Sequence, residues 1–247
     1  MERRKFVVGL GALAAGSSAA VGSGAFTAAE LSGREANISV VNDTNGLIGL
    51  QAGDSKLVSN DGGSNGNELA IDFNPDSGDG TGVNPNSKYQ VGGLGGIGNL
   101  DEVPGNPTLS PTIEDIAIDT NSDIEEEGNH AFSLLNQSGS DQAIEVTFEA
   151  NSSFPSDAEV YMVSKYEEGS GDSEETSALV ATATPDAREA SIIYSNETDY
   201  STDVDSGTDV RVSILVVVGD AATGADLGGT LTVRAGSHDD FTTADQS

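Results

Sequence analysis

The residues whose types and spacing could do chemistry lie in the stretch DTNSDIEEEG, residues 119–128. Oxygen-bearing side chains alternate with other residues there: Asp119, Asn121, Asp123 and Glu125. Oxygen ligands at the first, third and fifth positions begin a calcium-binding loop. However, Ile124 stands where that loop needs its turn glycine, and His130 stands where it needs a bidentate glutamate. Two interpretations stay open, a Ca²⁺ site and a solvated acidic turn.

Groups suited to catalysis are scarce in this chain. It has no cysteine and two histidines, of which His130 opens the predicted strand HAFSLLN and His238 lies near the C-terminus. The sequence has no His-Glu-x-x-His, Gly-x-Ser-x-Gly or phosphate-loop lysine motif, and its glycine-rich residues 92–100 lack the strand–helix context of a dinucleotide loop. We therefore expect no enzyme, no catalytic residues and no required cofactor, with Ca²⁺ as the one candidate ion.

Sequons for N-glycosylation are a second kind of candidate site, if the chain is exported. They begin at Asn37, Asn42, Asn136, Asn151 and Asn196. Asn151 and Asn196 lie in polar stretches that are typical of turns, where an acceptor is accessible. These two are therefore the favoured glycan sites.

The first 25 residues are predicted to be a twin-arginine signal peptide. The run RRKFV at residues 3–7 has two arginines followed by two apolar residues, and no charged residue occurs from Phe6 to Phe26. That segment is rich in Gly, Ala and Ser, so it suits a signal peptide better than a permanent membrane span. Small residues at 23–25 fit a cleavage site. We expect a secreted protein at the cell surface or outside the cell, without a stable membrane span in the mature chain.

The charge balance narrows the possible partners. The 247 residues include 41 acidic and 10 basic ones, for a formal net charge of −31. A chain this acidic has no basic patch for nucleic acid or an anionic lipid surface. It suits concentrated salt, because at 1 M the Debye length falls to about 3 Å and screens the repulsion between carboxylates. We expect the fold to be lost at about 0.1 M salt.

Strand-like patterning with a period of two dominates the chain after residue 25. In DVRVSILVVV, residues 209–218, every second residue from Val210 to Val218 is Val or Ile. Shorter runs of this kind recur, separated by clusters of Gly, Asn, Asp and Pro, and no window shows a convincing helical period. The sequence therefore predicts an all-β fold, an antiparallel β-sandwich or jelly roll.

One domain is expected at residues 26–235. Within it, residues 74–111 are dense in Gly, Pro, Asn and Ser, which predicts a long irregular loop insertion. Residues 236–247 are predicted to be a disordered tail.

Several stretches resemble an exported haloarchaeal protein family of unassigned function. They are the signal RRKFVVGLGALAAGSSAAVGSGAFT, then ISVVNDTNGLIGLQAG, ELAIDF, GTGVNPNSKYQV and HAFSLLNQSGSDQAIEVTFE. The F-x-L-x-N strand with its hairpin is also distantly similar to the TasA/camelysin group of secreted jelly-roll fibre proteins. That resemblance implies a fibre subunit in which the N-terminal segment of one copy completes the sheet of the next. The candidate donor segment is residues 26–41, with its strand at Ile38, Val40 and Val41.

Three function classes follow, in order of preference. The first is an exported cell-surface or extracellular-matrix structural protein, in its specific form a filament subunit that polymerises by donor-strand exchange with copies of itself or related surface subunits. The alternative is a secreted carbohydrate- or Ca²⁺-binding β-sandwich module. An exported hydrolase is less favoured, because it would need a pair of carboxylates set apart by burial.

Overall fold

Strands make up nearly all regular structure in the described part of the chain. The computed structural model describes residues 37–41, 47–55, 57–62, 68–72, 86–94, 124, 128–168, 175–198, 201–220 and 227–241, all within one unit of residues 31–247. The elements are β1 (Asn37–Val41), β2 (Ile48–Ala52), β3 (Val58–Gly62), β4 (Glu68–Asp72), β5 (Lys88–Val91), β6 (Phe132–Asn136), β7 (Ala143–Ala150), β8 (Glu159–Glu168), β9 (Glu175–Ala183), β10 (Glu189–Tyr194), β11 (Asp209–Val217), β12 (Gly229–Gly236) and the 3-10 helix η2 (His238–Asp240).

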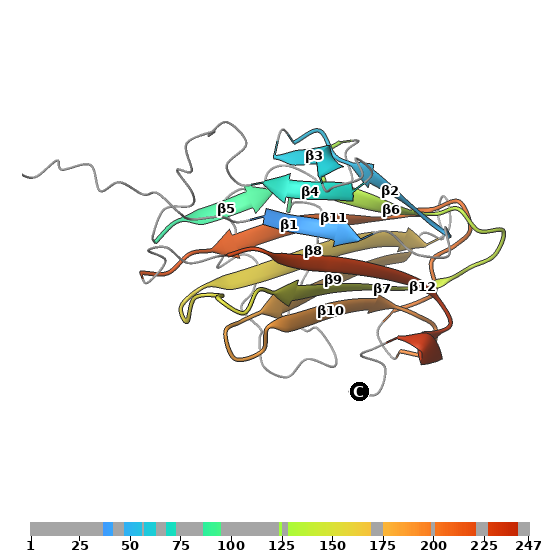
Figure 1. Ribbon diagram of the computed structural model, residues 1–247. Helices are drawn as coiled ribbons and strands as arrows, with labels where there is room; N and C mark the ends of the chain where they lie inside the picture. Colours follow the sequence, from blue (N-terminus) through green and yellow to red (C-terminus); the bar gives the residue numbers. More distant parts are fainter. Residues whose placement is uncertain are drawn as a thin grey trace, which may run out of the picture. The chain divides into compact units, whose positions relative to one another are not determined.

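The strands form two sheets (Figure 1). The first sheet has the order β10-β7-β12-β1-β4-β3, and the second has the order β2-β6-β11-β8-β9, with β5 also paired to β11. Every pair between these strands is antiparallel except β1 with β12, which is parallel. The sheets pack together, so the prediction of an all-β antiparallel sandwich is confirmed. Its jelly-roll form stays a prediction.

The period-two pattern decides which residues enter the core. In β11, Val210, Val212, Ile214 and Val216 are all fully buried, as their alternation predicts. In β12 the burial alternates along the whole strand, with Leu231, Val233 and Ala235 inside. Apolar side chains of both sheets meet in one cluster that includes Phe132, Phe148, Met162, Tyr194 and Leu231. Burial of such side chains, at about 1.5–3 kcal/mol each, is the main force that holds the two sheets together.

Polar contacts inside this core fix how the sheets face each other. The rings of Tyr166 and Tyr194 meet edge to face, with centroids 5.7 Å apart. The hydroxyls of Tyr194 and Ser164 lie 2.8 Å apart, and the Tyr166 hydroxyl accepts a hydrogen bond from the N–H of Asp205. These bonds satisfy hydroxyls that would otherwise be costly to bury.

The structure differs from the sequence prediction at two places. Residues 88–91, inside the predicted loop insertion 74–111, form strand β5, and Val91 and Leu94 are buried at 1% and 3% exposure. The predicted tail is also ordered at its start, because Phe241 is 6% exposed and packs with Ala143 and Ile193. In both cases a few apolar residues in a polar stretch bury enough surface to hold it. The predicted signal peptide lies outside the described residues.

Candidate functional site

Strand β1 occupies a bridging place in the first sheet. Its residues Ile38–Val41 pair with Gly229–Thr232 of β12, and Asn37–Val40 pair with residues 69–72 of β4. β12 and β4 are not paired with each other, so β1 alone joins the pair β3–β4 to β12, β7 and β10 among the described strands (Figure 1). The predicted donor residues Ile38, Val40 and Val41 all lie in this strand.

No hairpin turn joins β1 to either of its sheet neighbours, β4 and β12, although β2 of the second sheet follows it closely along the chain. β4 begins at Glu68 and β12 at Gly229, far along the chain from the end of β1 at Val41. A parallel neighbour needs a long crossover, so β1 is held beside β12 by the backbone ladder rather than by a hairpin turn.

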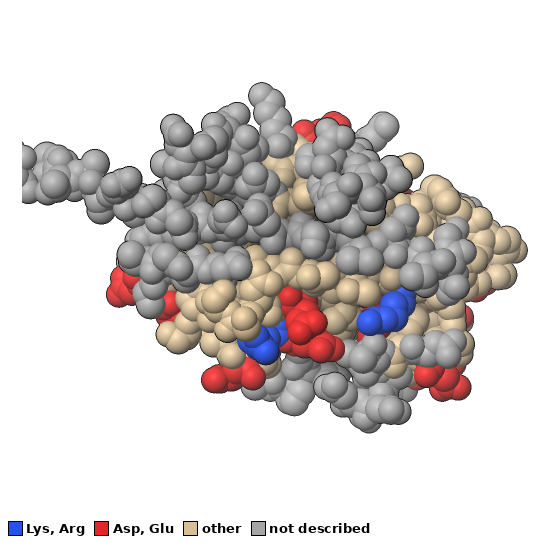
Figure 2. Space-filling view, viewed as in Figure 1, with Lys and Arg blue, Asp and Glu red and all other residues tan. Residues whose placement is uncertain are grey.

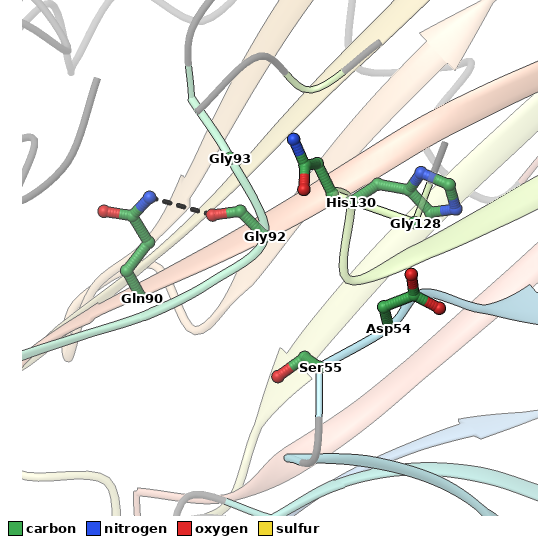
Figure 3. A pocket seen from close by; sticks show the side chains of 8 residues that line it. Asp54, Ser55, Gln90, Gly92, Gly93, Gly128 and His130 are labelled. Carbon is green, nitrogen blue, oxygen red and sulfur yellow. Dashed lines mark hydrogen bonds between the residues drawn. The ribbon is translucent and has the colours of Figure 1, made fainter. Parts of the chain in front are cut away.

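A polar hollow of about 380 Å³ lies in the second sheet, where β5 and β6 share one edge of β11 (Figure 3). β6 pairs with β11 from Asp209 to Val212, and β5 pairs with β11 from Ile214 to Val217. Between them the Ser213 hydroxyl donates a 2.7 Å hydrogen bond to the carbonyl of Gly93. The hollow is lined by residues 54–55 after β2, by Gln90, Gly92 and Gly93 of the β5 end, and by residues 128–130 before β6.

Backbone hydrogen bonds hold these three segments together. The N–H of Gly53 donates to the carbonyl of Ala131 at 2.9 Å, and the N–H of Asp54 donates to that of Gly128 at 2.8 Å. The N–H of Gly93 donates to the carbonyl of Asn129. The walls of the hollow are therefore fixed by backbone hydrogen bonds between the segments that flank β2, β5 and β6.

His130 is the most unusual group in this hollow. It is 8% exposed, and its Nδ1 has no hydrogen-bond partner among the described residues. Burial, and then the positive charge of Arg211, lower the pKa of His130, while Asp209 and Asp54 act in the opposite direction. The imidazole is therefore neutral at neutral pH, with a buried nitrogen free to bond a polar ligand. In Figure 3 the side chains of His130 and Asp54 lie on the same side of the hollow, opposite Gln90.

The hollow does not assemble the carboxylate pair that glycoside hydrolysis uses. Asp54 is the single carboxylate among the described residues that line it. The groups that line the hollow are therefore amides, a hydroxyl, backbone groups, a neutral imidazole and the carboxylate of Asp54.

The predicted glycan sites differ in how far their side chains are buried. Asn136 is fully buried, and its Nδ2 donates hydrogen bonds to the carbonyls of Ser140 and Val204, at 3.0 and 2.8 Å. Because a glycan must be attached to that nitrogen, the burial and hydrogen bonds of the amide disfavour Asn136 as a glycan site in the folded chain. The sequence signal for a sequon is the same whether the amide is buried or exposed.

The other sequons stay predictions. Asn196 is exposed, with its Nδ2 bonded to the carboxylate of Asp203 at 2.9 Å, and Asn151 is half-buried after β7. Asn37 lies in β1, and Asn42 lies outside the described residues.

The predicted Ca²⁺ ligands Asp119, Asn121, Asp123 and Glu125 also lie outside the described residues. Ile124, within the same stretch, is fully buried. A different group of possible metal ligands, Glu197, His238 and Asp239, comes together where η2 follows β12. Sequence reasoning missed it because His238 and Asp239 fall in the predicted tail, and nothing in the local sequence shows that Phe241 anchors them.

The visible face of the molecule carries both signs of charge (Figure 2). Small groups of basic side chains lie beside acidic ones on the described surface there. An ion pair joins Arg234 of β12 to the buried carboxylate of Glu145 of β7 at 2.7 Å. No helix of the described residues is long and apolar enough to cross a membrane.

Together these features define a β-sandwich in which strand β1 bridges two parts of one sheet. No protein-family model, curated protein or solved structure matches the chain.

Proposed function

We propose that this chain is an exported structural protein of the cell surface or extracellular matrix, and that its copies polymerise by exchange of strand β1. In a polymer, β1 of one copy would lie between β12 and β4 of the next. The observation that carries this proposal is the bridging place of β1, which pairs on both sides and joins strands that are not otherwise paired to each other.

Strand exchange requires no new kind of contact. The backbone N–H and C=O groups of β12 and β4 bond an added strand in the same register, whichever copy supplies it. The exchange preserves every backbone hydrogen bond of the sheet. The number of copies that are linked then depends on concentration and on the length of chain before and after β1.

A disulfide trap tests the exchange directly, because the chain has no cysteine of its own. Ser39 of β1 and Thr230 of β12 are register partners. With Ser39→Cys and Thr230→Cys, oxidation at high protein concentration is expected to give a ladder of covalent oligomers in a denaturing gel. Neighbouring strand positions satisfy the spacing that a disulfide needs.

The matched control links β7 to β12, which belong to the same body of the sheet. Thr147 and Thr232 are register partners, so Thr147→Cys with Thr232→Cys is expected to give only cross-linked monomer. A cross-linked monomer alone from the Ser39 and Thr230 pair, at every concentration, would show that β1 stays in its own chain and would overturn the proposal.

The second candidate function is a secreted binding module. The polar hollow with the buried, unpartnered Nδ1 of His130 favours it. A rise in Tm with Ca²⁺ or with an oligosaccharide, lost when Gln90→Ala alters the wall of the hollow, would support this function. Equal Tm values across such a panel would count against it.

A further inference from the structure

Three side chains with metal-ligating atoms meet at one end of the first sheet. Glu197 lies in the turn after β10, while His238 and Asp239 lie in η2 after β12. One ligand atom from each lies within 4.8 Å of the other two. Nδ1 of His238 is 3.7 Å from Oε2 of Glu197. We propose that Glu197, His238 and Asp239 bind a divalent transition-metal ion of the Zn²⁺ class.

The spacing of the donor atoms suits such an ion. With metal–ligand bonds of about 2.0–2.1 Å in a tetrahedral site, neighbouring ligand atoms lie about 3.3–3.4 Å apart. The 3.7 Å between His238 and Glu197 is close to that spacing. The carboxylates of Glu197 and Asp239 are exposed, so each can rotate the short remaining way. Three protein ligands leave one position for water or another ligand.

The imidazole of His238 is held in place by the residues around it. Phe241 anchors η2 on the sheet against Ala143 and Ile193. The rings of His238 and Phe241 meet edge to face with centroids 5.9 Å apart, and the N–H of Phe241 donates to the carbonyl of His238 at 3.0 Å. The side chain of His238 is accordingly only 14% exposed. A ligand that is already positioned loses little entropy when it binds the ion.

The turn that carries Glu197 is equally well defined. The N–H of Glu197 donates to Oγ of Ser195 at 3.1 Å, and the hydroxyl of Thr198 donates to the carbonyl of Ser195 at 2.8 Å. Oγ of Ser201 accepts from the N–H of Ser195 and donates to the carbonyl of Ile193. Within this turn, only the side chain of Glu197 therefore has to adjust.

The donor set selects the class of ion. An imidazole nitrogen with two carboxylate oxygens suits Zn²⁺ and its transition-metal neighbours, whereas Ca²⁺ and Mg²⁺ prefer sites made of oxygen alone. The ion would join the end of β10 to the segment after β12. Strands β10 and β12 both pair with β7, through Tyr194↔Ile144 and Gly236↔Ala143. The ion would therefore link these two neighbours of β7 across the first residues of β7. Because the chain has no cysteine, no disulfide can supply such a cross-link.

Imidazole NMR tests the proposal, because the chain has only two histidines. The ¹H–¹³C signals of His130 and His238 are followed while ZnSO₄ is added to the full chain in about 2 M sodium nitrate, which screens non-specific binding to the acidic surface. We expect saturable shifts of the His238 signals, with those of His130 unchanged. An excess of Mg²⁺ is expected to leave the Zn²⁺ shifts in place, because Mg²⁺ does not compete for nitrogen.

Three variants complete the experiment, with affinity measured by calorimetry. His238→Gln and Glu197→Gln are each expected to weaken Zn²⁺ binding by about tenfold or more. Asp186→Asn removes an exposed carboxylate in the turn between β9 and β10, and is expected to leave the affinity unchanged. Unchanged His238 signals, or equal losses in all three variants, would show that Zn²⁺ binds only to the acidic surface and would overturn the proposal.

Discussion

The carboxylate of Glu145 is fully buried and lies 2.7 Å from the guanidinium of Arg234 on the neighbouring strand. The two residues are register partners of β7 and β12, so this pair links the strand that receives β1 to the rest of the first sheet. Arg234 is 37% exposed, which leaves its charge in contact with water while it compensates the buried carboxylate.

Loss of that cation should destabilise the fold. Arg234→Met is expected to lower the free energy of unfolding by about 2 kcal/mol, less than for a wholly buried ion pair because Arg234 is partly hydrated. Combining it with Glu145→Gln should restore part of the loss, since the buried charge is then gone. Urea unfolding of the two single variants and the double variant measures the coupling. Additive losses would contradict an interaction between these two groups.

The buried amide of Asn136 makes a separate prediction. Its oxygen accepts hydrogen bonds from the N–H and hydroxyl of Ser138, at 3.0 and 2.7 Å, while its nitrogen donates to two carbonyls. Asn136→Asp keeps the shape of the side chain but replaces the amide nitrogen, which donates to two carbonyls, with an oxygen that can only accept. We therefore expect the free energy of unfolding to fall by about 2–3 kcal/mol. Mass spectrometry of the protein from its native cells should also find Asn136 without a glycan. A glycan there, or an Asp variant of unchanged stability, would contradict the buried position.

Two glycines offer a matched pair of substitutions. Gly92 has a φ of +92°, and a Cβ there would meet the Ser213 hydroxyl and lie 2.6 Å from the backbone N of Ala131. Gly92→Ala is therefore expected to cost about 2–4 kcal/mol and to widen the break between β5 and β6. Gly139→Ala meets nothing within 4 Å, and should change the free energy of unfolding by less than about 0.5 kcal/mol. Similar Tm values for the two variants would contradict the tight contact at Gly92.

The sequence predicts most of the fold because alternation reports directly on burial. Val210, Val212 and Ile214 are inside because every second residue of a strand faces the same way. Strand β5 is not predicted by this alternation, because it is four residues long and half of its residues are polar. Strand β5 forms because β6 pairs only with Asp209–Val212 of β11. The same edge of β11 continues to Val217, and Lys88–Val91 pair with that remaining part. Such a partner lies over a hundred residues away, beyond the reach of a local pattern.

The candidate sites were harder to predict for the same reason. Glu197 and His238 are brought together only by the strand order of the first sheet, in which β7 lies between β10 and β12. Likewise, the sequence around His130 does not indicate that Asp54 and Gln90 line the same hollow. Spacing along the chain predicts sites within one loop, and these sites are built from separate segments.

The last prediction concerns the dependence of stability on pH through His130. Burial and Arg211 lower the pKa of His130 in the folded chain below the value of about 6.5 that it has when unfolded, against the opposing charges of Asp209 and Asp54. The unfolded chain therefore binds more protons between those two pKa values, and stability rises with pH across that window. We expect full stability above about pH 7 and a progressive loss as the pH falls below about 6.5.

The variant His130→Gln should flatten this slope below about pH 6.5, since it removes the group that must stay neutral in the fold. The matched variant His238→Gln should leave the contribution of His130 in place, because His238 follows β12 of the first sheet whereas His130 precedes β6 of the second. The free energy of unfolding is measured in urea at several pH values, at one high salt concentration so that screening of the many carboxylates is constant. A slope that survives in His130→Gln would assign it to carboxylates, and would show that the buried imidazole gains its proton without cost to the fold.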